Sequence, residues 1–90
     1  MEMKHSTDQS IHSARQSIRS LSARELEVLE HAVLGETNRE IASALSVTVH
    51  AVKFHLGSIY RKLGVVNRTE AAVTLLRSRD VLVDTRQAWN

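Results

Sequence analysis

The chain has 90 residues, of which 42% are hydrophobic and 24% charged, and its formal net charge is +2. A single small domain of this length has a marginal core and no room for a deeply buried substrate site. The sequence has no cysteine, which excludes disulfides, thiolate metal sites and cysteine nucleophiles. It has no proline and only three glycines, which favours long helices over an all-β fold.

Residues 1–20 are expected to form a polar tail or linker that could be helical near its end. Ile11, Ala14 and Ile18 are spaced as an apolar helical stripe, but the stripe is too narrow for a core helix. The folded domain is expected to span residues 21–83, with residues 81–83 folding back onto it, and residues 84–90 are expected to be a C-terminal tail.

Four helix starts follow one another along the predicted domain. The expected N-caps, in chain order, are Ser22, Thr37, Thr48 and Asn67. A glutamate follows Ser22, Thr37 and Asn67 at the third position, as in a capping box. Gly35 and Gly64 stand where the first and third of these helices should end. Alternating apolar residues at 46–52 could indicate a strand, but the pattern becomes helical within one turn and no partner strand is nearby.

The third predicted helix has one narrow apolar face. On a wheel of 100° per residue, four side chains fall within about 60° of one another: Val52, Leu56, Ile59 and Leu63. The opposite face has no carboxylate and carries His50, Lys53, Phe54, Gly57, Ser58 and Arg61. A short helix, a tight turn at residues 46–47 and this longer helix match a helix-turn-helix, whose second helix enters the DNA major groove.

Charge along the chain also indicates a polyanionic partner. Residues 24–40 hold five acidic and two basic residues, whereas residues 41–69 hold four basic residues and no acidic one. A basic segment within a folded pattern favours nucleic-acid binding. A solvated helix face explains the charge alone equally well.

Five segments resemble the LuxR/NarL-type DNA-binding domain in their order and spacing. They are LSARELEVL (21–29), GETNREIA (35–42), VKFHL (52–56), YRKLGV (60–65) and NRTEA (67–71). The resemblance implies an all-α, compact four-helix domain with a central helix-turn-helix, from a cytoplasmic bacterial transcription regulator that binds double-stranded DNA as a dimer. Most members carry a further N-terminal domain, so the chain is either a short single-domain regulator or a fragment of a larger one.

The resemblance also implies which residues meet DNA. Lys53 and Phe54 match positions that reach base edges, Gly57 matches a third that is often longer and polar in relatives, and His50 is expected beside them. Ala51 stands where relatives usually have threonine. The residues suited to phosphate contact, some of which also suit capping, are Thr37, Asn38, Thr48, Ser58, Arg61, Lys62 and Arg68.

The fourth predicted helix is apolar over a wider arc than one buried stripe requires. Ala71 and Leu75 are assigned to the monomer core. Ala72, Val73 and Leu76 are then left over. The resemblance implies that the fourth helix usually forms the dimer contact, so these three residues are the expected homodimer interface.

Other function classes are disfavoured. The chain offers no pocket, nucleophile or phosphate loop for an enzyme, and His50 and His55 lack the i, i+4 spacing of helical metal ligands. No catalytic residue, metal, cofactor, membrane segment or small-molecule ligand is expected, and RNA polymerase is a candidate partner. Two alternatives are a sigma-type promoter-recognition domain, disfavoured by residues 64–71, and a module that sequesters another regulator, disfavoured by Lys53 and Phe54.

Overall fold

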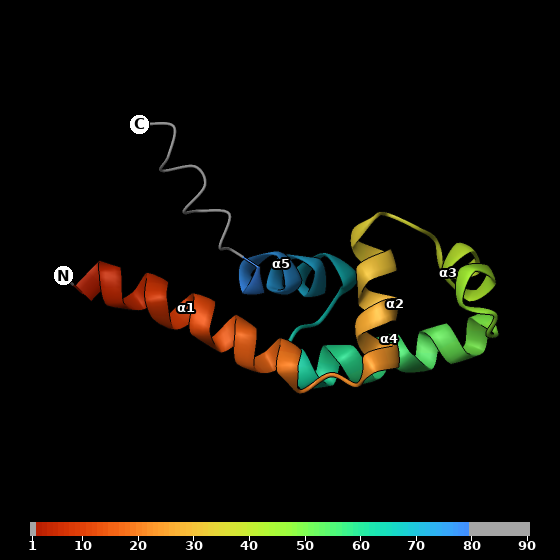
Figure 1. The fold of residues 1–90 in the computed structure, drawn as a ribbon, viewed down its shortest axis with the longest axis horizontal. Coiled ribbons are helices and arrows are strands. Elements are labelled where there is room, and N and C mark those ends of the chain that lie inside the picture. Colours follow the sequence, from red (N-terminus) through yellow and green to blue (C-terminus); the bar gives the residue numbers. More distant parts are fainter. Residues whose placement is uncertain (1, 80–90) are drawn as a thin grey trace.

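The computed structural model describes the backbone of residues 2–79 and the side chains of residues 11–79, and all regular structure in this part of the chain is helical. In chain order the helices are α1 (Glu2–Arg19), α2 (Ala23–Val33), α3 (Asn38–Leu45), α4 (Val49–Leu63) and α5 (Arg68–Ser78) (Figure 1). The all-α class is therefore confirmed, and residues 46–52 form the helix-turn-helix turn and the first residues of α4.

The last four helices begin at the N-caps that the sequence predicts. Ser22 and Thr37 each complete a capping box, Thr48 Oγ1 accepts the N–H of Ala51 at 3.0 Å, and Asn67 caps α5. These side chains satisfy backbone donors that would otherwise have no partner in the first turn. Local sequence therefore fixes where each of the four helices starts.

Two left-handed residues set the ends of the helix-turn-helix helices. Ser46, with φ 57°, ends α3, and Gly64, with φ 68°, ends α4. A left-handed residue lets the chain reverse direction directly after a helix, and glycine adopts it without steric cost. The turn between α3 and α4 is consequently short.

The core lies where α2, α3, α4 and α5 meet. Its largest fully buried side chains are Leu29, Ile41, Ile59, Leu75, Val28 and Val52. All four residues of the predicted apolar face of α4 are buried. Burying one face of α4 fixes the opposite face toward solvent, which positions the candidate site.

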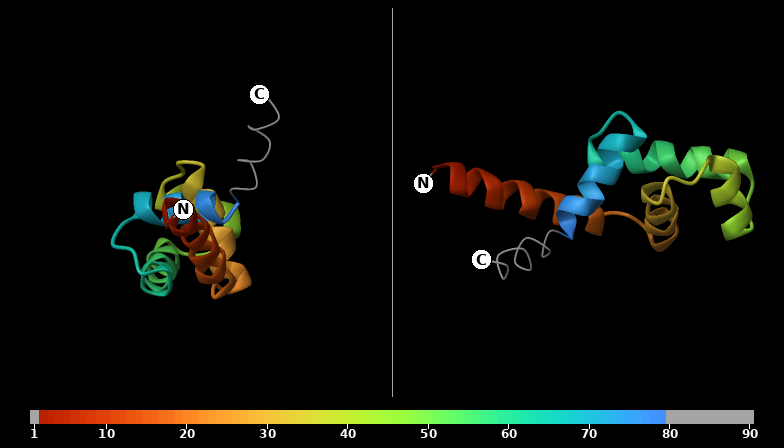
Figure 2. Two further views of the ribbon diagram at one scale, coloured as in Figure 1. Left: turned by 90° about the vertical axis from the view of Figure 1, so that its left-hand side faces the viewer. Right: turned by 90° about the horizontal axis from the view of Figure 1, so that it is seen from above.

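A further helix, α1, lies in the segment for which the sequence predicts a polar tail or linker that could be helical near its end. Helix α1 projects beyond the other four helices, and its C-terminal half packs against α5 (Figures 1 and 2). Ala14 is only 6% exposed, Ile18 packs against the core, and Arg15 Nε donates to the backbone oxygen of Ser78 at 3.1 Å. Of the narrow stripe, Ala14 is buried and Ile11 and Ile18 are half-buried, and α1 contacts mainly α5.

Two further expectations concern the ends and the environment of the chain. The predicted fold-back of residues 81–83 and the C-terminal tail at 84–90 lie outside the described residues. Among the helices that the structure describes, none is long and apolar enough to cross a membrane.

Deleting residues 1–19 should destabilise the domain without unfolding it. Loss of the Ala14 and Ile18 contacts removes roughly 1–2 kcal/mol of apolar burial, which lowers the melting temperature by roughly 4–16 °C for a domain of this size. Circular dichroism of both chains during heating measures the difference. An unchanged melting temperature would instead show that residues 1–19 behave as the polar tail that the sequence alone predicts.

Candidate nucleic-acid interface

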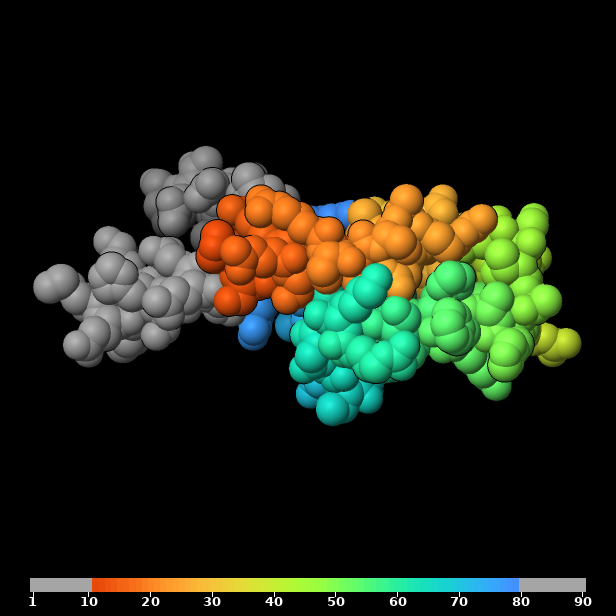
Figure 3. Space-filling model, turned by 90° about the horizontal axis from the view of Figure 1, so that it is seen from below, coloured from red at the N-terminus to blue at the C-terminus, as the bar shows by residue number. Residues whose placement is uncertain are grey.

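One face of α4 is open to solvent and carries residues that the sequence predicts to contact DNA. His50, Lys53, Phe54 and Arg61 are all exposed, and Phe54 exposes 66% of its surface. Figure 3 shows α4, in green and teal, at the surface beside the end of α1 and the start of α2. The exposed phenylalanine stands among cationic and imidazole side chains, so this face offers both apolar and charged groups to a partner.

Gly57 leaves room for Arg61 on the same face. A Cβ built on Gly57 would lie 3.7 Å from Nη1 of Arg61, which is ordinary van der Waals contact. The guanidinium group of Arg61 therefore folds back over the preceding turn of α4. A methyl group at Gly57 would therefore fit beside Arg61 without displacing it.

The N-caps of α3 and α4 are formed in a way that still leaves their hydroxyl protons available. Thr37 Oγ1 accepts the N–H of Glu40 at 3.1 Å, and Thr48 Oγ1 accepts the N–H of Ala51. Each hydroxyl acts only as an acceptor in its cap, so its O–H can still donate to an anion. Capping and phosphate contact are consequently compatible at both threonines, and both are exposed.

The N-terminus of α4 differs electrostatically from those of its neighbours. Helices α2, α3 and α5 each hold a glutamate in the first turn, but α4 holds no acidic residue there. The positive end of the α4 dipole is therefore not offset by a carboxylate of its own first turn. This adds to the cationic character of the exposed face.

A buried carboxylate ties the start of α2 to α4. Glu25 is 6% exposed, and its two oxygens accept from Ser22 N at 2.9 Å, Ser58 Oγ at 2.6 Å and Lys62 Nζ at 2.8 Å. Burial alone would raise the pKa of Glu25, but the hydrogen bonds from Lys62, Ser58 and Ser22 and the charge of Lys62 outweigh it and lower the pKa to about 2. Glu25 is therefore ionised in the folded domain at neutral pH.

This contact engages two residues that the sequence assigns to phosphate binding. The sequence predicts Glu25 only as part of a capping box, yet its carboxylate also accepts from Ser58 and Lys62. These two lie four residues apart on α4, at the border of its buried face. That spacing of two donors beside the core is the one signal that could have indicated a buried acceptor.

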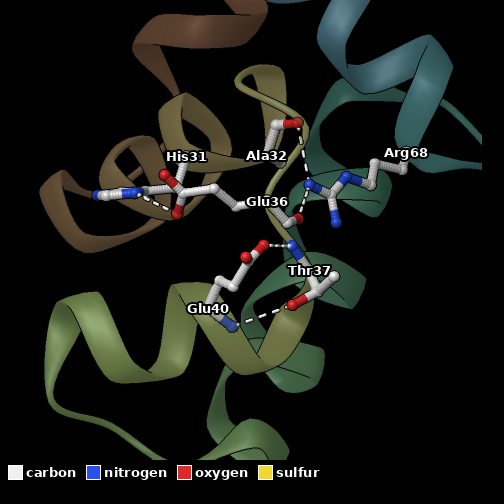
Figure 4. Close-up of polar contacts among 6 residues, drawn as sticks. All are labelled: His31, Ala32, Glu36, Thr37, Glu40 and Arg68. Carbon is white, nitrogen blue, oxygen red and sulfur yellow. Dashed lines mark hydrogen bonds and ion pairs between the residues drawn. The ribbon is translucent and has the colours of Figure 1, made fainter.

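Arg68 is likewise engaged inside the domain. Its Nη2 donates to the backbone oxygens of Ala32, at 3.0 Å, and of Glu36 (Figure 4). Tyr60 of α4 is close enough to feel the same charge. Burial raises the pKa of Tyr60, and the positive charge of Arg68 acts against that rise. Arg68 thus lies at the junction of α2, α3, α4 and α5.

The predicted dimer residues lie on the outer side of α5. Val73 is 40% and Leu76 55% exposed, and Ala72 is half-buried. Ala71 and Leu75 are fully buried, as expected for the core-facing side. An apolar strip therefore remains uncovered along α5.

The histidine and carboxylate side chains can also be considered as metal ligands. Within the described residues, no three histidine, cysteine, aspartate or glutamate side chains gather as a potential metal site. His31 Nδ1 instead donates to Glu36 Oε1 at 2.8 Å.

Comparison with known proteins places this arrangement in a family. The family model described as bacterial regulatory proteins, luxR family, matches residues 19–75, which is more than half of the chain. The chain belongs to the LuxR family of bacterial regulatory proteins. The matched segment includes α2, α3, α4 and most of α5, whereas α1 lies almost entirely before it. The LuxR-type resemblance seen in the sequence is thereby confirmed.

Three relatives illustrate the extent of the match. YhjB of Escherichia coli K12 is 50% identical over 58 residues, covering 64% of this chain and 29% of YhjB. The transcriptional regulatory protein LiaR of Bacillus subtilis is 48% identical over 54 residues, covering 60% of this chain and 26% of LiaR. The spore germination protein GerE of Bacillus subtilis is 44% identical over 57 residues, covering 63% of this chain and 77% of GerE.

These comparisons have two consequences for this chain. It spans less than a third of YhjB and LiaR but most of GerE, and no solved structure matches it. LuxR-family proteins are regulators of transcription, so the expectation that the chain is not an enzyme is confirmed.

Replacing Glu25 with glutamine should remove an acid-sensitive part of the stability. A folded-state pKa of about 2 against 4.5 means that the ionised carboxylate stabilises the fold above pH 4.5, and that this contribution is lost as the pH falls toward 2. The contribution at pH 7 is on the order of 3 kcal/mol. Urea unfolding from pH 7 to pH 2 should show lower stability and a flatter pH dependence in Glu25→Gln.

Glu27 provides the matched control for this experiment. It lies on the same helix with an exposed side chain and pairs only with the exposed Arg24 at 3.5 Å. Glu27→Gln should therefore leave stability nearly unchanged at every pH. Equal behaviour of the two variants would contradict the role assigned to the buried carboxylate.

Proposed function

We propose that this chain is a sequence-specific DNA-binding transcription regulator that places α4 in the major groove and binds a two-half-site operator as a dimer. The observation that carries the proposal is the exposed face of α4, which has cations, imidazole and an aromatic ring but no carboxylate. Membership of the LuxR family supports DNA as the partner. Such a face can meet both phosphates and base edges.

Two kinds of contact are assigned to α4 and to the helix starts of α3 and α4. Lys53 and Phe54 read base edges, with the ammonium group donating to guanine and the ring meeting a thymine methyl group, and His50 adds an edge contact. Arg61 and the hydroxyl groups of Thr37 and Thr48 bind phosphates, with Asn38 beside them. Ser58 and Lys62 act mainly through Glu25.

Dimerisation through α5 supplies the second half-site. The uncovered Val73 and Leu76 form an apolar strip that a two-fold contact buries, and the half-buried Ala72 permits close approach of two helices. Two recognition helices related in this way meet half-sites about one helical turn apart, ~10 bp. The strip is small, so we expect a weak dimer that tightens on DNA.

Selection of bound sequences from random duplex DNA tests the function directly. We expect an inverted repeat, and we expect the logarithm of affinity to fall with the logarithm of salt concentration at a slope of roughly −2 to −4. That slope corresponds to about one or two cationic contacts per subunit, from Arg61 and Lys53, since the neutral hydroxyl groups release no counterions. Failure to enrich any sequence, together with a slope near zero, would exclude DNA as the partner.

Alanine at Lys53 or Phe54 should act differently from alanine at Arg61. Loss of a base contact costs ~1–3 kcal/mol on the selected site and less on random DNA, so specificity falls. Arg61→Ala should weaken both DNAs alike and flatten the salt slope. Fluorescence anisotropy with both duplexes measures these effects, and equal losses on the two DNAs for Lys53→Ala and Phe54→Ala would contradict direct base reading.

Glutamate at Val73 should abolish cooperative binding and leave the monomer folded. The side chain is exposed, so the charge is tolerated in the monomer but not in an apolar two-fold contact. Leu34→Glu adds the same charge to an exposed apolar residue outside α5 and serves as the control. Parent-like affinity of Val73→Glu for a two-half-site duplex would show that α5 is not the interface.

A further inference from the structure

The peptide group that leads the chain into α3 is held at both of its edges. The carbonyl oxygen of Glu36 accepts from Arg68 Nη2, and the N–H of Thr37 donates to Glu40 Oε1 at 2.8 Å (Figure 4). These two groups belong to one planar unit. Fixing both therefore fixes the direction in which α3 begins.

The donor to the carbonyl oxygen of Glu36 comes from a helix that is distant in the sequence. Arg68 is the first residue of α5, and the same Nη2 also donates to the oxygen of Ala32 in the last turn of α2. One guanidinium nitrogen thus joins the end of α2, the entry to α3 and the start of α5. His31 holds the side chain of Glu36 from α2, so the segment between α2 and α3 is fixed at backbone and side chain alike.

We propose that Arg68 is a positioning residue for DNA binding, which sets the N-terminus of α3 against the DNA backbone without touching a phosphate itself. This proposal rests on the proposed function. It gives Arg68 a different role from the phosphate contact that the family resemblance implies. The groups that Arg68 positions are the exposed hydroxyl of Thr37 and the side chain of Asn38.

The geometry separates Arg68 from Arg61. Arg61 is exposed and its guanidinium lies over the solvent side of Gly57, whereas Arg68 is half-buried and turned onto two backbone oxygens. Moving Arg68 to a phosphate would leave the carbonyl groups of Ala32 and Glu36 without this donor. The inward geometry is therefore the more stable use of this cation.

The test compares Arg68→Ala with Arg61→Ala on the selected operator. Circular dichroism gives the folded fraction, affinity at several salt concentrations gives the slope, and ethylation interference maps the phosphates. For Arg68→Ala we expect a folded protein that binds about tenfold more weakly with the parent slope, because Thr37 and Asn38 are neutral. Interference should be lost at the phosphates that face α3 and kept at those that face α4, and Arg61→Ala should show the opposite pattern with a flatter slope.

Three results would overturn the proposal. One is a flatter slope for Arg68→Ala, as expected of a phosphate contact. Another is parent-like affinity, and the third is an affinity loss fully explained by the unfolded fraction. If Arg68→Ala is unfolded, Glu40→Ala is the second test, because it frees the N–H edge of the same peptide group at an exposed position. Unchanged ethylation interference at the phosphates opposite α3 would then refute positioning. Absence of DNA binding by the parent chain would instead refute the proposed function.

Discussion

The orientation of α4 depends on the carboxylate of Glu25. An ionised group with so little exposure is stable only when its oxygens are matched by donors, and here the donors come from the start of α2 and from two successive turns of α4. Apolar packing of Val52, Leu56 and Ile59 buries one face of α4 and so turns the opposite face to solvent. The hydrogen bonds to Glu25 are directional, so they hold α4 in this orientation against the start of α2.

Features set by a few consecutive residues were predictable from the sequence. The N-caps at Ser22, Thr37, Thr48 and Asn67 act through hydrogen bonds within one turn, and the buried face of α4 follows from helical periodicity alone. The polar contacts between helices were not predictable in the same way. Glu25 with Lys62 and Arg68 with Ala32 pair residues more than thirty positions apart. No local pattern specifies such a pair, because its geometry exists only once the helices have packed.

Helix α1 illustrates the same limit for apolar residues. Ala14 and Ile18 are too few to predict a core helix from their spacing alone. Their burial depends on α5, which offers a complementary surface from the other end of the domain. The dependence is mutual, since the side of α5 that α1 covers is closed to any other partner. Covering by α1 therefore helps to leave Val73 and Leu76 as the apolar strip that remains open.

The basic residues of segment 41–69 differ in whether they contact the rest of the domain or solvent. Four cations and no acid between residues 41 and 69 give an apparently uniform basic segment, but the fold divides them into two pairs. Lys62 neutralises Glu25 and Arg68 binds backbone oxygens, so these two stabilise the domain. Lys53 and Arg61 stay on the open face of α4. The net charge of a segment thus overstates the cations available to a polyanion. In this domain Lys62 and Arg68 hold helices together, which leaves Lys53 and Arg61 as the two cations of this segment for the proposed DNA contact.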